Sequence, residues 1–229
     1  MQTITDFCVK AKKIKTNRVD KDMKGTFITF EGCEGVGKSR QIKMLEEYLQ
    51  AHGKQYYLTR EPGGTAVSEQ IRKVILDGSL VTMTDECEAL LYAASRVQLL
   101  KEEIAPRLQR GELVFCDRYI DSSLAYQGYA RGLGVEFVEK INDYAVKNFM
   151  PDYTIFLCLE PELAFKRKGG VDATDRVELS GMEFHNKVFE GYKALAKRDS
   201  QRFLVIDASG EKHETHQKII NALKEKGVL

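Results

Sequence analysis

A glycine-rich segment near the N-terminal end of the chain has the residue types that bind phosphate groups. It consists of Gly32, Cys33, Glu34, Gly35, Val36, Gly37, Lys38 and Ser39 and matches the pattern G-x-x-x-x-G-K-[ST]. A β-rich run precedes it and a helical pattern follows it, as this pattern requires. Its backbone N–H groups can surround phosphate oxygens, while Lys38 reaches the β- and γ-phosphates and Ser39 binds Mg²⁺. The segment predicts a nucleoside triphosphate site, with a flexible strand–helix turn as the alternative.

A second set of residues could hold the group that receives the phosphate. An enzyme that joins two polyanions end to end needs arginines on the far side of its cleft. Arg60, Arg96 and Arg118 are candidates, because they lie at expected strand ends or on a helix that faces the cleft. Asp117 ends a short apolar strand, where a carboxylate can hold Mg²⁺ or its water, and Arg118 can bridge the two phosphates. A strand-end ion pair is the alternative for Asp117 and Arg118.

Composition and missing patterns exclude several classes of protein. The 229 residues include 35 Lys and Arg against 34 Asp and Glu, so the net charge of +1 does not indicate nucleic acid as a partner. No apolar run is long enough to span a membrane, and no secretory leader is visible. The 5 cysteines are widely spaced, which favours free thiols in a reducing cytoplasm. The Asn/Thr-Lys-x-Asp stretch of a regulatory GTPase is missing, so a small cytoplasmic nucleotide or metabolite kinase fits best.

Short β-rich runs alternate with longer helical patterns along the chain. The expected strands are Thr26–Glu31, Gln55–Thr59, Leu113–Cys116, Thr154–Leu159 and Phe203–Ile206. The expected helices are Ser39–His52, Ala66–Leu76, Asp85–Arg110, Gly134–Asn148, Met182–Lys197 and His213–Lys226. Strands that alternate with helices indicate βαβ crossovers. The sequence therefore predicts an α/β fold of three layers, with a five-stranded parallel sheet flanked by helices.

One domain, residues 25–229, accounts for this pattern. Residues 1–24 differ from it, because they are rich in Lys and Arg and have few apolar residues. They are expected to be a basic arm, an added segment, or a misassigned start with Met23 as the true one. Within the domain, the charge-dense stretch Lys166–Arg176 is expected to be a loop. It would form a basic lid at about residues 166–178, with a solvated surface loop as the alternative.

Four motifs in the same order resemble those of thymidylate kinases, and the resemblance covers essentially Lys24 to the C-terminus. The first is Thr29–Gly32 with Glu34–Ser39, which is similar to the bacterial form of the family's phosphate loop. The second is TREPGGT, Thr59–Thr65. The third is Asp117–Tyr119 followed by Ser122, Ser123 and Tyr126–Gly128, and the fourth is Asp175 and Arg176 followed by Glu178. The resemblance implies a P-loop kinase that transfers the γ-phosphoryl group of Mg·ATP to dTMP.

The resemblance also implies roles for single residues. Lys38, Arg118 and Arg167 would be catalytic, Arg176 would bind ATP together with the phosphate loop, and Ser39 and Asp117 would hold Mg²⁺. The substrate-binding residues would be Glu34, Arg60, Pro62, Tyr92, Arg96, Arg118, Ser123, Tyr126 and Gln127. Tyr92 would stack on thymine, with core packing as its alternative, Tyr126 would sit against the deoxyribose, and Glu34 would face a sugar hydroxyl. Ser95 departs from the family, which often has Asp there, and this leaves open how Arg96 is held.

Two further inferences concern charge and assembly. The phosphate loop contains no arginine, so Lys166, Arg167, Lys168 and Arg176 would have to supply positive charge to the transferring phosphoryl group. The expected helix Asp85–Arg110 is apolar on more than one face, and a homodimer would cover the surplus, as the resemblance also implies. Two other functions remain open, namely a P-loop kinase for another nucleoside or nucleotide and a nucleotide-binding regulatory protein without turnover.

Overall fold

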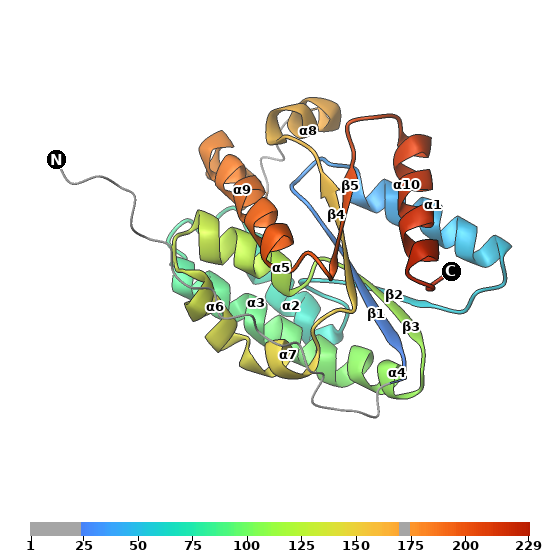
Figure 1. Cartoon of the computed structure of the whole chain (residues 1–229). Coiled ribbons are helices and arrows are strands. Elements are labelled where there is room, and N and C mark those ends of the chain that lie inside the picture. The colour runs from blue at the N-terminus through green and yellow to red at the C-terminus, as the bar shows by residue number, and fades with distance from the viewer. Residues whose placement is uncertain (1–23, 170–174) are drawn as a thin grey trace.

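The computed structural model describes residues 24–169 and 175–229, and a five-stranded parallel sheet lies at its centre (Figure 1). The strands are β1 (Thr26–Glu31), β2 (Tyr57–Arg60), β3 (Leu113–Asp117), β4 (Tyr153–Cys158) and β5 (Phe203–Asp207), in the spatial order β2-β3-β1-β4-β5. Parallel strands covered on both faces are buried along nearly their whole length, as β1 and β4 are, and β4 is also almost continuously apolar. The predicted sheet is thereby confirmed.

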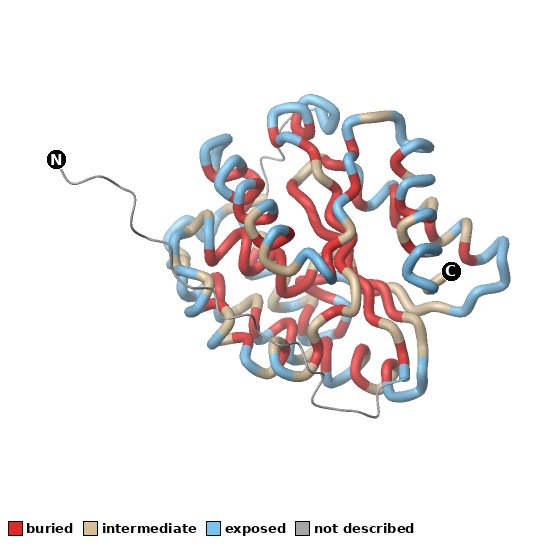
Figure 2. The backbone as a smooth tube through the Cα atoms, viewed as in Figure 1, coloured by how far each residue is buried: buried red, intermediate tan, exposed pale blue. Residues whose placement is uncertain are grey.

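Helices cover both faces of the sheet and complete the predicted three layers. They are α1 (Lys38–Ala51), α2 (Ala66–Leu76), α3 (Asp85–Leu99), α4 (Ala105–Gln109), α5 (Ile120–Ser123), α6 (Val135–Ile141), α7 (Asp143–Asn148), α8 (Pro161–Lys168), α9 (Met182–Arg198) and α10 (Lys212–Glu225). Helices α1 and α10 lie together on one face, and α3, α5, α7 and α9 lie on the other (Figure 1). Buried segments in Figure 2 concentrate in the strands and in the helix sides that face them.

Two expected helices are interrupted. The expected helix Asp85–Arg110 contains a π-helical turn, η1 (Leu100–Ile104), between α3 and α4. Pro106 follows this turn. Proline lacks an amide hydrogen and its ring crowds the carbonyl of the preceding turn, and the wider π-helical turn accommodates both effects. The expected helix Gly134–Asn148 breaks at Asn142, whose side-chain amide donates to the carbonyl of Val138 at 2.9 Å.

The other differences from the expected elements concern one unexpected helical segment and the start of the expected lid, and some expectations fall on residues that the structure does not describe. The segment Ile120–Ala130, for which no element was expected, forms α5 and the π-helical turn η2 (Leu124–Ala130). The expected loop Lys166–Arg176 is wrong at its start, because Lys166, Arg167 and Lys168 form the last turn of α8. Residues 170–174 of the expected lid, and residues 1–23 of the expected basic arm, lie outside the described residues.

Candidate active site

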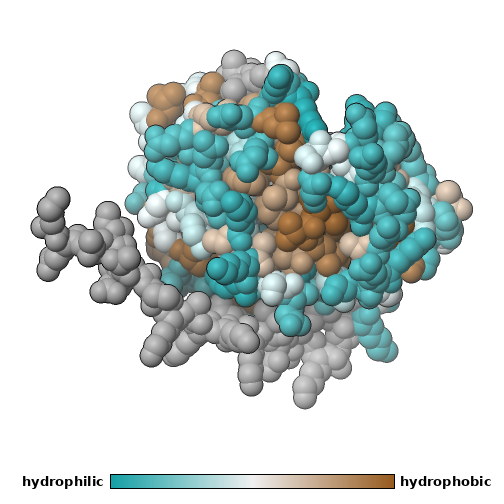
Figure 3. All heavy atoms as spheres, turned by 45° about the horizontal axis from the view of Figure 1, so that its top comes forward, coloured by the Kyte–Doolittle hydropathy of each residue, from teal (hydrophilic) through white to brown (hydrophobic). Residues whose placement is uncertain are grey.

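One cavity of about 760 Å³ lies at the carboxyl edge of the sheet, which is where α/β proteins bind ligands. The phosphate loop after β1, the ends of β2 and β3, the turn after β3 and the loop after β5 all contribute to its lining. In Figure 3, which brings this edge forward, hydrophilic side chains border a hollow in the surface. The cavity is therefore shared by the two sets of residues that the sequence singled out.

The phosphate loop has the backbone geometry that its glycines permit. Gly35 and Gly37 have φ of 76° and 94°, in the left-handed region that favours glycine. A Cβ at Gly35 would lie 2.5 Å from the carbonyl oxygen of Ala164, so α8 packs directly on the loop. The ammonium of Lys38 donates to the carbonyls of Gly32 and Cys33, each at 3.0 Å. Burial, and then the charge of Arg118, lower the pKa of Lys38 below its ordinary value.

Ser39 and Asp117 line the cavity on adjacent elements. Ser39 is in the first turn of α1, and Asp117 is the last residue of β3. The Oδ1 atom of Asp117 is buried and, among the described residues, has no hydrogen-bond partner. Buried carboxylate oxygens need a partner, and a carboxylate with a hydroxyl is a donor set that Mg²⁺ accepts. The residues present therefore fit a magnesium ion beside the phosphate loop.

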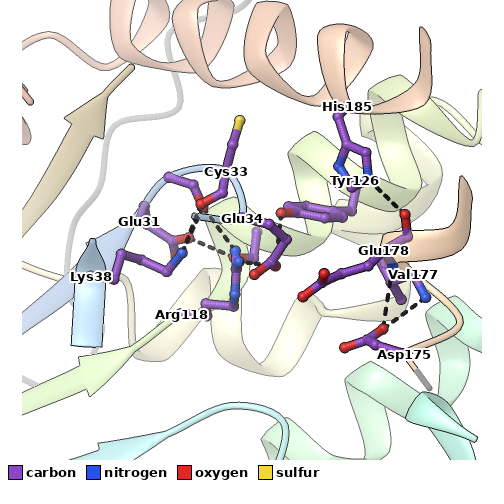
Figure 4. Close-up of polar contacts among 12 residues, drawn as sticks. Glu31, Cys33, Glu34, Lys38, Arg118, Tyr126, Asp175, Val177, Glu178 and His185 are labelled. Carbon is purple, nitrogen blue, oxygen red and sulfur yellow. Dashed lines mark hydrogen bonds and ion pairs between the residues drawn. The ribbon is translucent and has the colours of Figure 1, made fainter. Parts of the chain in front are cut away.

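Arg118 points from the end of β3 into the centre of the cavity (Figure 4). Its backbone φ of 67° is unusual for a residue with a side chain, and such strain is typical of functional sites. The guanidinium donates to the Gly32 carbonyl at 3.1 Å and pairs with Glu34, which also accepts from the Tyr126 hydroxyl at 3.3 Å. Burial favours the neutral form of Glu34, but Arg118 and then Lys38 outweigh it and lower the pKa of Glu34 to about 2.

Arg96 reaches the same cavity from α3, but its side chain is almost entirely committed to protein contacts. It is 1% exposed, and its Nε atom donates to Glu61 at 2.8 Å. The two Nη atoms donate to Asn142 at 2.6 Å, to the Tyr119 carbonyl at 3.1 Å and to Ser123 at 3.0 Å. These contacts hold Arg96 in place although Ser95 stands where thymidylate kinases often have Asp.

The remaining candidates divide between the cavity and its surroundings. Those that line it are Arg60, Pro62, Tyr92, Ser123, Tyr126, Gln127 and Arg167. Arg167 donates to the carbonyls of Ala208 and Ser209, in the loop after β5. Arg176 pairs with Glu88 and donates to the Ile75 carbonyl at 3.2 Å, and it is absent from the cavity lining formed by residues 24–169 and 175–229.

Sequence reasoning missed two parts of the lining. Arg72 on α2 donates to the Pro62 carbonyl at 2.8 Å and lines the cavity near Arg60. The segment after β5 contributes a second group, namely Ala208, Gly210 and Glu211 in the loop and Lys212 and Thr215 in the first turn of α10. The rule that ligands bind beyond the carboxyl ends of parallel strands could have found this loop. For Arg72, which is one arginine on an amphipathic helix, the sequence contains no comparable signal.

Glu31 is a buried carboxyl at the end of β1, and it gives the protein a testable pH dependence. Burial and the Asp121 carboxylate raise the pKa of Glu31 from 4.5 to about 7, against the opposing effects of Ser122 and Arg118. The folded protein therefore binds this proton more tightly than the unfolded chain. The resulting stabilisation is complete below the unfolded pKa and is lost as the pH rises through about 7.

We expect the free energy of unfolding, measured with urea, to fall between about pH 4.5 and pH 7 by up to about 1.4 kcal/mol per pH unit for this one group, and to level off above that range. The fall should be smaller in Glu31→Gln, which cannot ionise. The difference between the two proteins isolates Glu31 from all other titrating groups. Parallel curves for the two proteins would show that Glu31 does not titrate in this range.

Three features define a small P-loop kinase. They are the order of the strands, the glycine-rich loop between the first strand and its helix, and a cavity lined both by the phosphate loop and by arginines far from it in the sequence. The comparisons with known proteins narrow this class. A family model described as thymidylate kinase matches residues 30–219, and the chain belongs to the thymidylate kinase family.

Relatives match along nearly their whole length. A thymidylate kinase from Thermoanaerobacter sp. (strain X514) is 47% identical over 202 residues, which cover 88% of this chain and 98% of the relative. One from Bacillus velezensis is 47% identical over 205 residues, covering 89% and 97%. The crystal structure of thymidylate kinase from Ehrlichia chaffeensis superposes with a TM-score of 0.71 at 31% identity, covering 87% of this chain and 98% of that one. Across the described residues, no helix has the length and apolar character to cross a membrane.

Proposed function

We propose that the protein transfers the γ-phosphoryl group of ATP to dTMP and so forms dTDP and ADP. One observation carries the proposal: a single cavity joins the phosphate loop to Arg118, Tyr126 and Gln127, so a donor and an acceptor nucleotide can lie end to end. Membership in the thymidylate kinase family supports dTMP as the acceptor. Arg118 contacts Gly32 and Glu34 of the phosphate loop and lines the same cavity as Tyr126, which supports a role for it between the two phosphates.

In the proposed reaction, an oxygen of the dTMP phosphate attacks the γ-phosphorus and the bond to the β-phosphate oxygen breaks. The protein contributes mainly by positioning the reactants and by stabilising charge. The backbone N–H groups of the phosphate loop and Lys38 would hold the donor, and Arg118 would neutralise charge between the two phosphates. Ser39 and Asp117 would hold Mg²⁺, which when bound neutralises charge on the donor phosphates.

We propose that Arg167 and Arg176 supply further positive charge, because no arginine lies between Gly32 and Ser39. The packing of α8 on Gly35 supports this role for Arg167, because it brings the last turn of that helix to the border of the phosphate loop. Both arginines would have to leave their present partners, which are backbone carbonyls for Arg167 and mainly Glu88 for Arg176.

An assay of ADP release over a panel of nucleoside monophosphates tests the proposal against its two alternatives. Turnover of dTMP well above all other monophosphates would support a thymidylate kinase. A higher rate with another acceptor would indicate a different small P-loop kinase. Tight ATP binding without turnover of any acceptor would indicate a nucleotide-binding regulatory protein.

We propose that the protein is a cytoplasmic homodimer. Exposed apolar side chains recur at seven-residue spacing on two neighbouring helices, Val67 and Val74 on α2 and Leu90 and Val97 on α3. An isologous contact between two copies would bury this face. The four cysteines among the described residues are free thiols, which suits a reducing compartment. Light scattering that reports a monomer at micromolar concentration would contradict the dimer.

Tyr126 is expected to distinguish deoxyribose from ribose. Its ring is 5% exposed, lines the cavity, and packs edge-on against Phe184 and Tyr192, so it forms a rigid wall. A 2′-hydroxyl pressed against such a ring loses its water without gaining a partner. We expect Tyr126→Ala to narrow the kcat/KM ratio of dTMP over ribothymidine monophosphate by roughly tenfold or more.

Tyr126→Phe separates the ring from its hydroxyl, which donates to Glu34. The phenylalanine variant should largely keep the discrimination, because the ring performs the exclusion. Unchanged discrimination in Tyr126→Ala would place the wall elsewhere. Equal loss in both variants would instead assign the selection to the hydroxyl.

A further inference from the structure

We propose that Tyr192, with Ser122 and Glu31, forms a fixed support that holds the guanidinium of Arg118 at the point of phosphoryl transfer. This proposal rests on the proposed function only in the step that it assigns to Arg118. Tyr192 lies on α9, far from Arg118 in the sequence, and is fully buried. The described residues that line the cavity do not include Tyr192, so it acts as a positioning residue through Arg118.

One nitrogen of Arg118 makes all the contacts to this support. The Nη1 atom donates to Ser122 Oγ at 3.2 Å and to the Tyr192 hydroxyl at 3.4 Å, as well as to the Gly32 carbonyl at 3.1 Å. The Nη2 atom instead pairs with Glu34. The support thus fixes one side of the guanidinium and leaves the other for a partner that changes. That partner is Glu34 in the free protein and phosphate oxygens during the reaction.

Glu31 sets the direction of the hydrogen bonds in the support. The hydroxyls of Ser122 and Tyr192 donate to its Oε2 atom at 2.6 Å and 2.8 Å, and they lie 2.8 Å from each other. A hydroxyl can donate or accept, whereas a guanidinium only donates and an ionised carboxylate only accepts. Glu31 therefore draws the hydroxyl hydrogens away, and oxygen lone pairs remain facing Arg118.

The same carboxylate holds the backbone beside Arg118. The Oε1 atom of Glu31 accepts from the backbone N–H of Tyr119 at 2.8 Å, directly after the strained φ of 67° at Arg118. Strained backbone persists where surrounding contacts fix it on several sides. Glu31 thus restrains both the main chain and, through the two hydroxyls, the side chain of Arg118.

Packing fixes the Tyr192 ring independently of its hydroxyl. The ring stacks on Phe156 with centroids 5.2 Å apart and an interplanar angle of 23°, and it meets the Tyr126 ring edge-on at 6.3 Å. Tyr192→Phe keeps these contacts and removes only the hydroxyl. The variant therefore tests the hydrogen bond to Arg118 with little change in the core.

A double-mutant cycle at pH 8, above the pKa of about 7 of Glu31, tests the proposal with whichever monophosphate the parent protein turns over. We expect Tyr192→Phe to lower kcat about tenfold with KM for ATP nearly unchanged, because a hydrogen bond to a charged group is lost. In an Arg118→Ala background the same substitution should change kcat by less than about twofold. Tyr144→Phe, on α7 and away from the cavity lining formed by the described residues, is the matched control and should leave kcat unchanged.

Equal losses in the two backgrounds would overturn the proposal, as would a lower Tm with an unchanged kcat. If Tyr192→Phe does not fold, Ser122→Ala enters the same cycle with the same expectation. If the parent turns over no monophosphate, the proposed function fails but the support can still be tested. NMR of ¹⁵N-labelled arginine should then show slowed rotation of the Arg118 guanidinium in the parent and faster rotation in Tyr192→Phe, and equal rotation would contradict the support.

Discussion

Replacing Arg118 with alanine is expected to lower kcat/KM for dTMP on the order of a thousandfold, because an arginine contact to transferring phosphoryl groups is worth that much or more. Its guanidinium lies beside Gly32 of the phosphate loop and lines the same cavity as Tyr126 and Gln127. Alanine and arginine bear a similar backbone penalty at a φ of 67°, so the substitution removes mainly charge and hydrogen bonds.

The matched control for Arg118→Ala is Arg110→Ala, which removes an exposed arginine that pairs with Glu112 at the opposite end of β3. That variant should keep normal kinetics. Arg118→Lys should recover only part of the loss, since an ammonium cannot contact the support and a phosphate through two separate nitrogens. A near-normal kcat/KM in Arg118→Ala would show that the transferring group does not depend on this residue.

The removal of Arg118 should also change the ionisation of Glu34. Burial favours the neutral form of this carboxyl, and Arg118 is the larger of the two main charges that lower its pKa to about 2. We therefore expect the pKa of Glu34 to rise in Arg118→Ala. The kinetic sign of this higher pKa would be a fall of kcat/KM at acid pH that occurs in Arg118→Ala and not in the parent protein.

The parts of this fold that the sequence predicted are those whose signals are local. The glycine-rich loop, the apolar strands and the amphipathic helices each follow from residues close together in the chain. The helical segment Ile120–Ala130 escaped prediction for a physical reason. Residues 119–128 are all buried, so no polar face alternates with an apolar one and the helical period disappears.

Other features of the structure were hard to predict for one of two reasons. Either their sequence signal was weak, or they arise from contacts between distant residues that no local sequence pattern indicates. Helix α8 starts with Pro161 at a position that favours a helix start, but its few residues and high charge resembled a loop. The environment of Arg96 is of the second kind. Its partners Glu61, Asn142 and Ser123 come from three separate parts of the chain, so only the folded chain shows that this arginine joins them.

The role of Tyr192 could not be predicted from the sequence either. It is an apolar-face residue of an amphipathic helix, where core packing is the ordinary explanation. Its hydroxyl reaches Arg118, Ser122 and Glu31 because α9 packs against α5 and η2, which follow β3. Sequence motifs therefore located the residues that face the ligands, whereas the buried groups that hold those residues in place required the structure.

Lys38→Ala is the second substitution with a large expected effect, and it should lower kcat on the order of a thousandfold. In the free protein its ammonium is the centre of the phosphate loop, where it donates to the carbonyls of Gly32 and Cys33. Phosphate oxygens of the donor would compete for the same hydrogens. The alanine variant therefore loses both the charge that stabilises the β- and γ-phosphates and a contact that holds the empty loop together.

Lys38→Met separates these two losses, because methionine retains most of the side-chain volume without the charge. We expect Lys38→Met to be more stable than Lys38→Ala in thermal unfolding but equally deficient in kcat, with KM for dTMP changed much less than kcat. Lys43→Ala, on an exposed turn of the same helix, is the control and should be fully active. A kcat within tenfold of the parent in Lys38→Met would mean that the backbone N–H groups and Mg²⁺ alone stabilise the transferring phosphoryl group.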